Sequence, residues 1–347
     1  MSNILVIRLS VIGDVAMTIP VIYSVAKSNP EDTFTVLTQA FLIPMFINRP
    51  ANVKVMGLNT QASEKSFGGL LRFATILGKN KYDKIIDLQN DTRSFTLLFC
   101  SLLKATRIYR LDRESRKRKL IKDPNRKSFE PLRPAILRYE DVFRRAGLNY
   151  EESFASVYES KQPDLSKIHE IAGTKSGKWI GIAPFARYTE KVYPTDRMEE
   201  IVEQLAEHED FRIFLFGARG YEGEVLDSWA YQYPRVINIV GKLNLEEELA
   251  LISQLDVLVC MDSSNVHFAS LVGTQVITIW GATHPDAGFT GYRQSPDNNI
   301  QLEMACRPCS VVGNKPCWKK ERYCLQIPKE TILGKILEVV SVKPEKK

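Results

Sequence analysis

Short runs of apolar and β-branched residues alternate with longer segments of helical periodicity along the whole chain. Buried strands form such short continuous runs, so the alternation predicts an α/β protein with parallel sheets and helical crossovers. The runs predict strands at 4–9, 34–38, 53–56, 84–88, 106–110, 179–183, 211–216, 236–240, 257–260 and 276–280. The periodic segments predict helices at 15–27, 67–77, 92–103, 131–146, 196–207, 221–231, 245–253, 265–272 and 328–340.

A polar segment at 159–178, which contains Gly173 and Gly177, separates two such series. Each series has the strand–helix alternation of a Rossmann-like domain, and 347 residues is a suitable length for two domains. We therefore expect a linker in this segment. We also expect a cleft between the carboxyl ends of two parallel sheets, because open α/β sheets bind their ligands there.

Composition excludes several other classes of protein. Hydrophobic residues make up 44% of the chain and charged residues 25%, which is ordinary for a globular protein and unlike a disordered or fibrous one. Its apolar runs are much shorter than the ~20 residues that span a bilayer. Arg8 and Asp14 also interrupt the segment where a signal peptide needs an unbroken apolar core. We therefore expect a cytoplasmic protein.

Positive charge is concentrated at 104–127, where eleven Lys or Arg residues face three Asp or Glu, while the whole chain carries only +6. Such a segment suits a polyanion, either an acidic membrane surface, a phosphorylated lipid or nucleic acid, although many charged segments are simply solvated. Arg116 and Arg118 lie at its centre. The segment has few interleaved aromatic residues and no nucleic-acid-binding motif accompanies it, so we do not expect nucleic acid as a partner.

The loop after the first predicted strand is polar at the position where a Rossmann sheet binds ligand. It carries Arg8, Ser10 and Asp14, with Gly13 allowing a tight turn. Asp14 can be a catalytic carboxylate or the N-cap of the next helix, and the pattern alone favours the cap. The sequence has no G-x-G-x-x-G and no G-x-x-x-x-G-K-[ST] motif, which argues against a dehydrogenase or a P-loop ATPase.

Two strand-end loops of the second half carry charged groups. Arg187 and Lys191 follow the first strand of that half, where they suit a diphosphate or are ordinary solvated charges. Glu222 and Glu224 follow the second strand, and either could accept a hydrogen bond from ribose hydroxyls. The pattern alone does not distinguish these two glutamates.

A third loop of the second half begins a helix with hydroxyls at its start. The strand at 257–260 leads into Asp262, Ser263, Ser264 and His267. Hydroxyls, free backbone N–H groups and the positive end of the helix dipole can together bind an anion. An ordinary Asp or Ser cap with a buried His is the alternative.

Four cysteines, Cys306, Cys309, Cys317 and Cys324, fall late in the chain. Four thiolates could hold a structural zinc, but the spacing departs from paired C-x2-C knuckles, and reduced or redox-labile thiols are at least as well supported. The sequence contains no D-x-D motif. We therefore expect cations and a helix end to neutralise a donor's phosphates, with no metal and no cofactor.

The motifs in these loops resemble the family-nine glycosyltransferases, the ADP-heptose:lipopolysaccharide heptosyltransferases. The resemblance covers nearly the whole chain and rests on ILVIRLSVIGDVAMTIP, APFARYTEKVYP, LFGARGYEGE, CMDSSNVHFASLVGTQVITIWGATHP and the cysteine-bearing tail, in that order. It implies a GT-B fold, two Rossmann-like domains whose parallel sheets face a central cleft. The implied domains are an acceptor-side domain at 1–165, a nucleotide-sugar donor domain at 175–328, and a C-terminal helix at 329–347 that returns to the first domain.

The resemblance also implies roles for individual residues. Asp14 matches the family's general base, and Lys191 matches the cation that holds the donor diphosphate. Asp262, Ser263 and His267 match the donor motif, usually D-[ST]-G-x-x-H.

Three positions depart from the family pattern, and all of them touch the expected donor pocket. Ser264 replaces the usual Gly, Tyr193 stands where a Trp is common, and His284 stands where an Asp is frequent. We also expect donor contacts from Arg187 and Glu222, and acceptor contacts from residues of the two basic or polar segments, namely Arg8, Ser10, Arg116 and Arg118.

The implied activity is inverting transfer of a sugar, heptose from ADP-heptose, to a lipopolysaccharide core or lipid A-type acceptor. The expected partners are the nucleotide sugar and a phosphorylated glycolipid at the inner membrane surface, which the protein touches only peripherally. A nucleotide-sugar epimerase of similar architecture, or a non-catalytic nucleotide-sugar-binding protein, is the alternative.

Overall fold

The structure is a computed structural model that describes residues 1–59, 67–100, 107–121 and 130–341. The chain divides into two compact units by its internal contacts. The first unit comprises Met1–Ser115 and Arg133–Lys161, and the second comprises Arg116–Leu132 and Gln162–Lys347. The division after Lys161 falls within the polar segment at 159–178, which also contains a short helix, α7 (Ser166–Ala172).

A five-stranded parallel sheet forms the centre of the first unit, with the strand order β3-β2-β1-β4-β5. Its strands are β1 (Asn3–Ile7), β2 (Thr33–Gln39), β3 (Val53–Leu58), β4 (Lys84–Asp87) and β5 (Arg107–Arg110). The strand order reverses between β1 and β4, so the loops after these two strands lie where a Rossmann sheet forms its ligand crevice.

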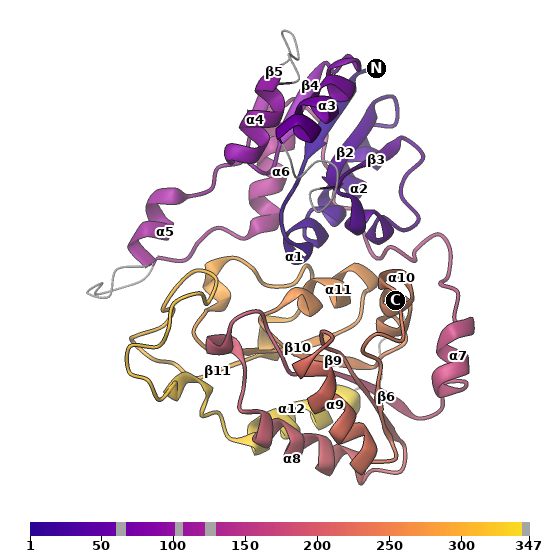
Figure 1. Ribbon diagram of the computed structural model, residues 1–347, viewed down its shortest axis with the longest axis vertical. Coiled ribbons are helices and arrows are strands. Elements are labelled where there is room, and N and C mark those ends of the chain that lie inside the picture. Colours follow the sequence, from indigo (N-terminus) through magenta and orange to yellow (C-terminus); the bar gives the residue numbers. More distant parts are fainter. Residues whose placement is uncertain (60–66, 101–106, 122–129, 342–347) are drawn as a thin grey trace. The chain divides into compact units, whose positions relative to one another are not determined.

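Helices cover both faces of this sheet (Figure 1). They are α1 (Ile12–Ala16), α2 (Ile19–Ser28), α3 (Phe67–Gly78), α4 (Thr92–Cys100) and α6 (Ala135–Arg145), and the 3-10 helix η1 (Ala40–Met45) follows β2. Phe73 and Leu77 of α3 and Leu97 of α4 pack on Leu5 and Ile7 of β1 in one apolar core. This packing fixes the carboxyl end of β1 relative to the helices that follow it.

The helix predicted at 15–27 is two helices in the structure. The first, α1, ends at Ala16, and α2 begins at Ile19, with Pro20 in its first turn. Proline has no backbone N–H and fits only the first turn of a helix, which explains the restart. The parts of predicted elements at 101–103 and 106 lie outside the described residues, as do Lys104, Lys122, Arg126 and Lys127.

The second unit has a six-stranded parallel sheet with the order β11-β10-β9-β6-β7-β8. Its strands are β6 (Lys178–Ala183), β7 (Phe211–Leu215), β8 (Val236–Asn238), β9 (Val257–Met261), β10 (Val276–Trp280) and β11 (Asn299–Gln301). The order reverses between β6 and β9, which repeats the topology of the first unit. The loops after β6 and β9 therefore lie at the second ligand-binding position.

Helices also flank the sheet of the second unit (Figure 1). Besides α7, they include α5 (Ser115–Ile121), α8 (Thr195–Ala206), α9 (Tyr221–Gln232), α10 (Leu245–Ile252), α11 (Ser264–Val272) and α12 (Lys329–Ser341). One large apolar core contains buried residues of the sheet and of α8, α9 and α12.

Two elements group with the second unit by their packing. The C-terminal helix α12 packs on α8 and β9, and its Ile332 and Ile336 are fully buried in the core of the second unit. Over Lys329–Ser341 this helix is therefore part of the second unit. The basic helix α5 also groups with the second unit, because Ile121 packs in an apolar cluster with Val311 and Leu132.

Candidate active site

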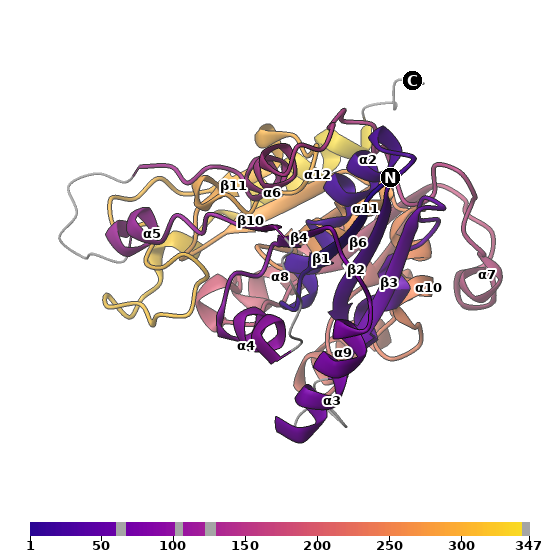
Figure 2. The ribbon, with the colours of Figure 1, turned by 90° about the horizontal axis from the view of Figure 1, so that it is seen from above.

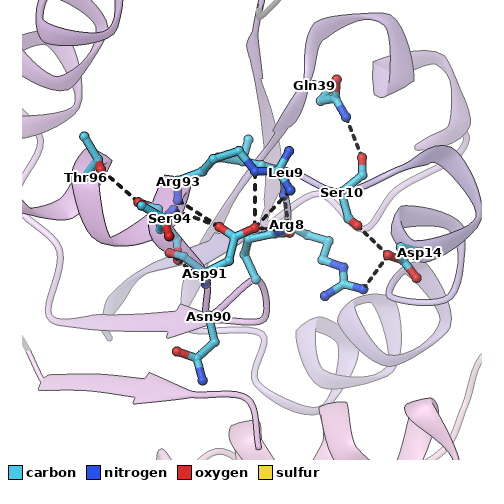
Figure 3. Close-up of polar contacts among 12 residues, drawn as sticks. Arg8, Leu9, Ser10, Asp14, Gln39, Asn90, Asp91, Arg93, Ser94 and Thr96 are labelled. Atoms are coloured by element: carbon cyan, nitrogen blue, oxygen red, sulfur yellow. Dashed lines mark hydrogen bonds and ion pairs between the residues drawn. The ribbon is translucent and has the colours of Figure 1, made fainter. Parts of the chain in front are cut away.

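Asp14 lies in α1, directly after the carboxyl end of β1. The N-cap of α1 is Val11, which makes no side-chain cap bond, so Asp14 is the third residue of the helix and not its cap. Its carboxylate accepts a hydrogen bond from the Ser10 hydroxyl and lies 3.3 Å from the guanidinium of Arg8 (Figure 3). The Asp14 side chain keeps 26% of its exposure. Asp14 is therefore not a helix cap. Its carboxylate is partly accessible to solvent and is held in one orientation by Ser10 and Arg8.

Arg8 is buried, and its guanidinium is held from three sides. It donates to the Leu88 carbonyl after β4, donates to the Tyr139 hydroxyl of α6 at 3.0 Å, and pairs with Asp14. The guanidinium also lies over the Tyr139 ring at 5.3 Å. These contacts orient the arginine toward Asp14.

The loop after β4 forms a second polar network, which is connected to the loop after β1 (Figure 3). Asp87 is fully buried and accepts hydrogen bonds from the Ser94 hydroxyl and the Asn90 backbone N–H. Burial raises the pKa of Asp87, and these hydrogen bonds oppose the rise. The Gln89 side chain accepts from the Leu9 N–H at 3.1 Å and donates to Asp91 at 2.6 Å. Gln89 thus ties the β4 loop to the β1 loop that carries Ser10.

In the second unit, Lys191 and Asp262 form a buried ion pair. The Lys191 ammonium lies 3.1 Å from Asp262 Oδ2, and the same oxygen accepts a hydrogen bond of 2.7 Å from the Thr283 hydroxyl. These residues follow β6, β9 and β10, three adjacent strands. Since the two charged side chains are only 11% and 13% exposed, Lys191 is not a solvated loop charge.

A loop far along the sequence packs on Lys191. Gly313 has φ +79°, and a Cβ built there would lie 2.6 Å from Cγ of Lys191. The start of this loop is fixed by Arg307, which is buried and donates to the carbonyls of Gly281 and Thr283 at 2.6 and 2.8 Å. A glycine at 313 therefore leaves space for the extended lysine side chain.

The start of α11 has the predicted residues, but Ser263 caps the helix and Asp262 does not. Ser263 is the N-cap and accepts from the Asn265 N–H, so Ser264 is the first helical residue. Asp262 is directed away to Lys191. His267 lies within the first turn and is buried.

The other residues expected in the donor pocket are Arg187 and one of the two glutamates, Glu222 or Glu224. Arg187 is exposed, with its guanidinium over the Tyr188 ring at 5.6 Å. Glu222 accepts from the Ala218 N–H at 2.7 Å in the loop before α9, while Glu224 is exposed. The Glu222 carboxylate therefore already has a partner in its own loop.

Two of the positions that depart from the family pattern have structural partners. The buried Tyr193 hydroxyl donates to the Ile327 carbonyl at 2.7 Å. His284 Nδ1 accepts from the Asp286 N–H at 3.1 Å. Burial, with a further contribution from Arg307, lowers the pKa of His284, which keeps the ring neutral for this contact.

Arg116 and Arg118, which we expected to contact the acceptor together with Arg8 and Ser10, belong to the other unit. Arg118 lies over the Phe289 ring at 5.4 Å, and Arg116 is exposed on α5. The structure therefore groups Arg8 with Ser10 and groups Arg116 with Arg118, and it does not bring the four into one unit.

The four late cysteines are all free thiols, and burial raises the pKa of Cys324 to about 11. Within the described part of the chain, no group of three or more Cys, His, Asp or Glu side chains is arranged to hold a metal ion. The same described residues include no helix that is long and apolar enough to cross a membrane.

Sequence reasoning missed Tyr139, Gln89, Thr283, Arg307 and Gly313. Each has at least one partner far away in the sequence, from 21 residues for Thr283 and Asp262 to 131 for Tyr139 and Arg8. Strand-end position was a usable signal only for Gln89 and Thr283, because both lie within three residues of the end of a predicted strand.

Two Rossmann-like units, each with charged groups at its strand-reversal point, agree with the GT-B architecture of glycosyltransferases. The model of glycosyltransferase family 9 (heptosyltransferase) matches residues 70–318. This chain therefore belongs to glycosyltransferase family 9, as its motifs predict.

Curated relatives and solved structures agree with this assignment. Lipopolysaccharide heptosyltransferase 3 of Escherichia coli K12 is 23% identical over 335 residues, which cover 93% of each chain. Lipopolysaccharide heptosyltransferase 1 of Campylobacter coli is 25% identical, with 97% of this chain and 98% of that protein covered. The structure of Escherichia coli ADP-heptose LPS heptosyltransferase II has a TM-score of 0.70 at 16% identity, covering 98% of both chains.

Proposed function

We propose that this glycosyltransferase moves heptose from ADP-heptose to a sugar hydroxyl of the lipopolysaccharide core. Family membership supports the transfer chemistry, and the relatives named above are heptosyltransferases acting in lipopolysaccharide synthesis. The polar groups at both strand-reversal points support a two-substrate reaction, with the acceptor at the first unit and the donor at the second. The predicted domain roles, 1–165 for the acceptor and 175–328 for the donor, are part of this proposal.

Asp14 acts as the general base. Its carboxylate takes the proton of the acceptor hydroxyl while the hydroxyl oxygen forms a bond to the anomeric carbon of the donor sugar. The bond from that carbon to the diphosphate oxygen breaks, and ADP leaves with the electron pair from the opposite face, so the configuration inverts. Ser10 and Arg8 hold the carboxylate in place, which is how a positioned base contributes about 10²–10⁴ in rate.

Lys191 stabilises the departing diphosphate, together with the start of α11. An ammonium group has three donors, and the Asp262 pair uses one of them, so others are available to phosphate oxygens. The N–H groups beside Ser263 and Ser264 add the positive end of the helix dipole. Arg187 and Glu222 complete the donor pocket in this proposal, the first at phosphate and the second at ribose.

Arg116 and Arg118 of α5 recruit the phosphorylated acceptor glycolipid. The protein works in the cytoplasm and touches the inner membrane peripherally, where the acceptor's lipid part is embedded. Exposed cations near an anionic surface each contribute about 1 kcal/mol to such recruitment.

The observation that carries the proposal is the Asp14 carboxylate, partly accessible and held by Ser10 and Arg8. The test incubates the purified protein with ADP-heptose, with and without heptose-deficient lipopolysaccharide, and analyses both substrates by mass spectrometry. A transferase adds one heptose to the acceptor and leaves the donor unchanged when the acceptor is omitted. Conversion of the donor sugar without acceptor would indicate an epimerase, and binding without any conversion would indicate a non-catalytic protein.

A further inference from the structure

The loop at 306–325 is fixed at both ends and exposed between them. Arg307 at its start donates to backbone carbonyls of the second unit, and Leu325 at its end is buried against Gly281. Between these anchors the residues from 314 to 323 are mostly exposed. The loop therefore presents its middle part to solvent on a rigid base.

This exposed part combines one large aromatic ring with several cations. Trp318 is 70% exposed, and the Lys319 ammonium lies 5.1 Å from its ring. Around it are three exposed cations, the half-buried Lys319 and one further aromatic residue. We name the group the Trp318 surface: Lys315, Trp318, Lys319, Lys320, Arg322 and Tyr323. Glu321 is the one acidic residue between 314 and 323. The surface is thus aromatic and strongly positive.

The basic helix α5 lies beside this loop within the same unit. Ile121 of α5 packs in a small apolar cluster with Val311 and Leu132, against which Phe289 is half-buried. Figures 1 and 2 both show α5 next to the yellow and orange segments of this loop region. Four consecutive cations, Arg116 to Lys119, therefore lie on a helix next to this loop region, and Lys117 among them pairs with Glu130.

We propose that the Trp318 surface docks the protein on an anionic phospholipid bilayer. Tryptophan prefers the interface of a bilayer, where its ring contacts acyl chains and its N–H stays hydrated. Lysine and arginine side chains beside it are attracted to anionic headgroups. A nucleic acid would also attract the cations, but ring stacking along a strand needs a row of aromatic residues, and here Trp318 and Tyr323 stand alone.

This docking rests on the proposed function, because membrane contact brings the enzyme to an acceptor that is embedded in lipid. The same loop packs on Lys191 through Gly313. Docking of the loop would therefore hold the part of the protein next to Lys191 at the membrane. Binding to lipid itself needs neither substrate. It can therefore be measured separately from transfer.

The chain offers a specific reporter for this test. Of its four tryptophans, Trp179, Trp229 and Trp280 are each only 1% exposed, so Trp318 alone is open to a water-soluble quencher such as acrylamide. The protein is mixed with vesicles of phosphatidylcholine, or of phosphatidylcholine with about a quarter phosphatidylglycerol. We expect binding and protection of Trp318 from acrylamide with the anionic vesicles only, and weaker binding as salt is raised.

Two variants and two matched controls locate the surface. Trp318→Ser should weaken vesicle binding and remove the quenchable fluorescence, while Tyr231→Ser, an aromatic residue that is 93% exposed on α9, should change neither. The double variant Lys315→Gln/Lys320→Gln should weaken binding about 25-fold at low salt, about five-fold per charge. The control Lys167→Gln/Lys242→Gln removes the half-buried Lys167 and the exposed Lys242, two charges of the same unit outside the Trp318 surface, and should bind like the wild type.

Equal binding to neutral and anionic vesicles, wild-type affinity of the Lys315/Lys320 variant, or a bound protein whose Trp318 stays open to acrylamide would each overturn the proposal. Protection by a single-stranded RNA oligonucleotide, without protection by vesicles, would overturn it in favour of nucleic acid. If vesicle binding fails while a deacylated, water-soluble acceptor still receives heptose, only the docking proposal fails. If lipid binds as expected and that acceptor receives nothing, only the proposed function fails.

Discussion

At the residue scale, the Asp14 carboxylate, which we propose as the general base, is held through side chains from three separate segments. Asp14 comes from α1, Arg8 from the end of β1, and Tyr139 from α6, 131 residues away from its arginine. The polar composition of the first loop is visible in the sequence, and it correctly groups Arg8, Ser10 and Asp14. The orientation of Arg8 toward Asp14 is not visible there, because it depends on a tertiary contact with Tyr139.

Replacing Asp14 by Asn should reduce turnover about 10²–10⁴-fold, since the amide cannot take the acceptor's proton. The amide oxygen can still accept from Ser10, so the melting temperature and the affinity for ADP-heptose should stay close to wild type. Steady-state kinetics and thermal denaturation check this. Asp141→Asn removes a carboxylate of the same unit whose side chain is 45% exposed, and it should keep full activity. Turnover of Asp14→Asn near the wild-type rate would leave Asp14 without a catalytic role.

Replacing Gly313 by Ala should displace Lys191 and weaken binding of ADP. The new methyl group would lie 2.6 Å from Cγ of Lys191, and alanine is also strained at φ +79°. Calorimetric titration of ADP should give a dissociation constant at least about ten-fold higher, as expected for disturbing one charge-assisted contact. The control Gly334→Ala, in α12, meets no atom within 4 Å and should stabilise the protein by about 0.5–1 kcal/mol. Unchanged ADP affinity in Gly313→Ala would show that the loop does not position Lys191.

At the element scale, the strands were largely predictable and some helices were not. Buried parallel strands form continuous apolar runs, so ten predicted strands match β1–β10 within a few residues. The sequence pattern did not predict the short helices α5 and α7, because their residues are mostly polar. It did not predict β11, because that strand has only three residues. The packing of α12 and α5 on the second unit could not be predicted, because it depends on partners distant in sequence.

Helix α10 should give the protein a measurable pH dependence. Burial raises the pKa of Glu248 to about 7 from its ordinary value of 4.5. Between these two values the folded chain binds more protons than the unfolded chain, so the free energy of unfolding decreases as pH rises through this range. Glu248→Gln removes the free-energy cost of ionising this buried carboxyl group in the folded chain. It should therefore match the wild type below pH ~4.5 and exceed its stability by about 1–2 kcal/mol at pH ~8, a value reduced because Glu248 is partly exposed.

Chemical denaturation at several pH values checks this prediction. Glu246→Gln removes the same charge from an exposed position of the same helix turn, so its stability should follow the pH dependence of the wild type. A Glu248→Gln variant whose stability differs from wild type by the same amount at every pH would contradict the assignment.

At the scale of the whole molecule, two units with the same strand topology each place their charged groups at the point where the strand order reverses. The general rule for open α/β sheets therefore predicts where the two clusters lie. It does not predict that Asp262 pairs with Lys191, or that a loop from 306–325 encloses the lysine. Those features depend on chain segments that the rule does not cover.

Transfer should survive chelation of divalent metals. The sequence has no D-x-D motif, and Lys191 with the start of α11 supplies positive charge for the diphosphate. Heptose transfer assayed after treatment with EDTA should proceed at the untreated rate, with an unchanged melting temperature. A loss of transfer that Mg²⁺ restores would contradict this account of the donor site. Unfolding on chelation, with stoichiometric metal released, would instead indicate a structural site at the four cysteines.

We propose that Asp14 activates an acceptor hydroxyl for direct displacement at the anomeric carbon of a heptose donor. The most direct test is the NMR assignment of the anomeric configuration in the product formed from ADP-heptose and heptose-deficient lipopolysaccharide. We expect the wild-type protein to form a linkage of the opposite configuration to the donor, and Asp14→Asn to form almost none. A product with the donor's own configuration would contradict the single displacement and with it the role of Asp14.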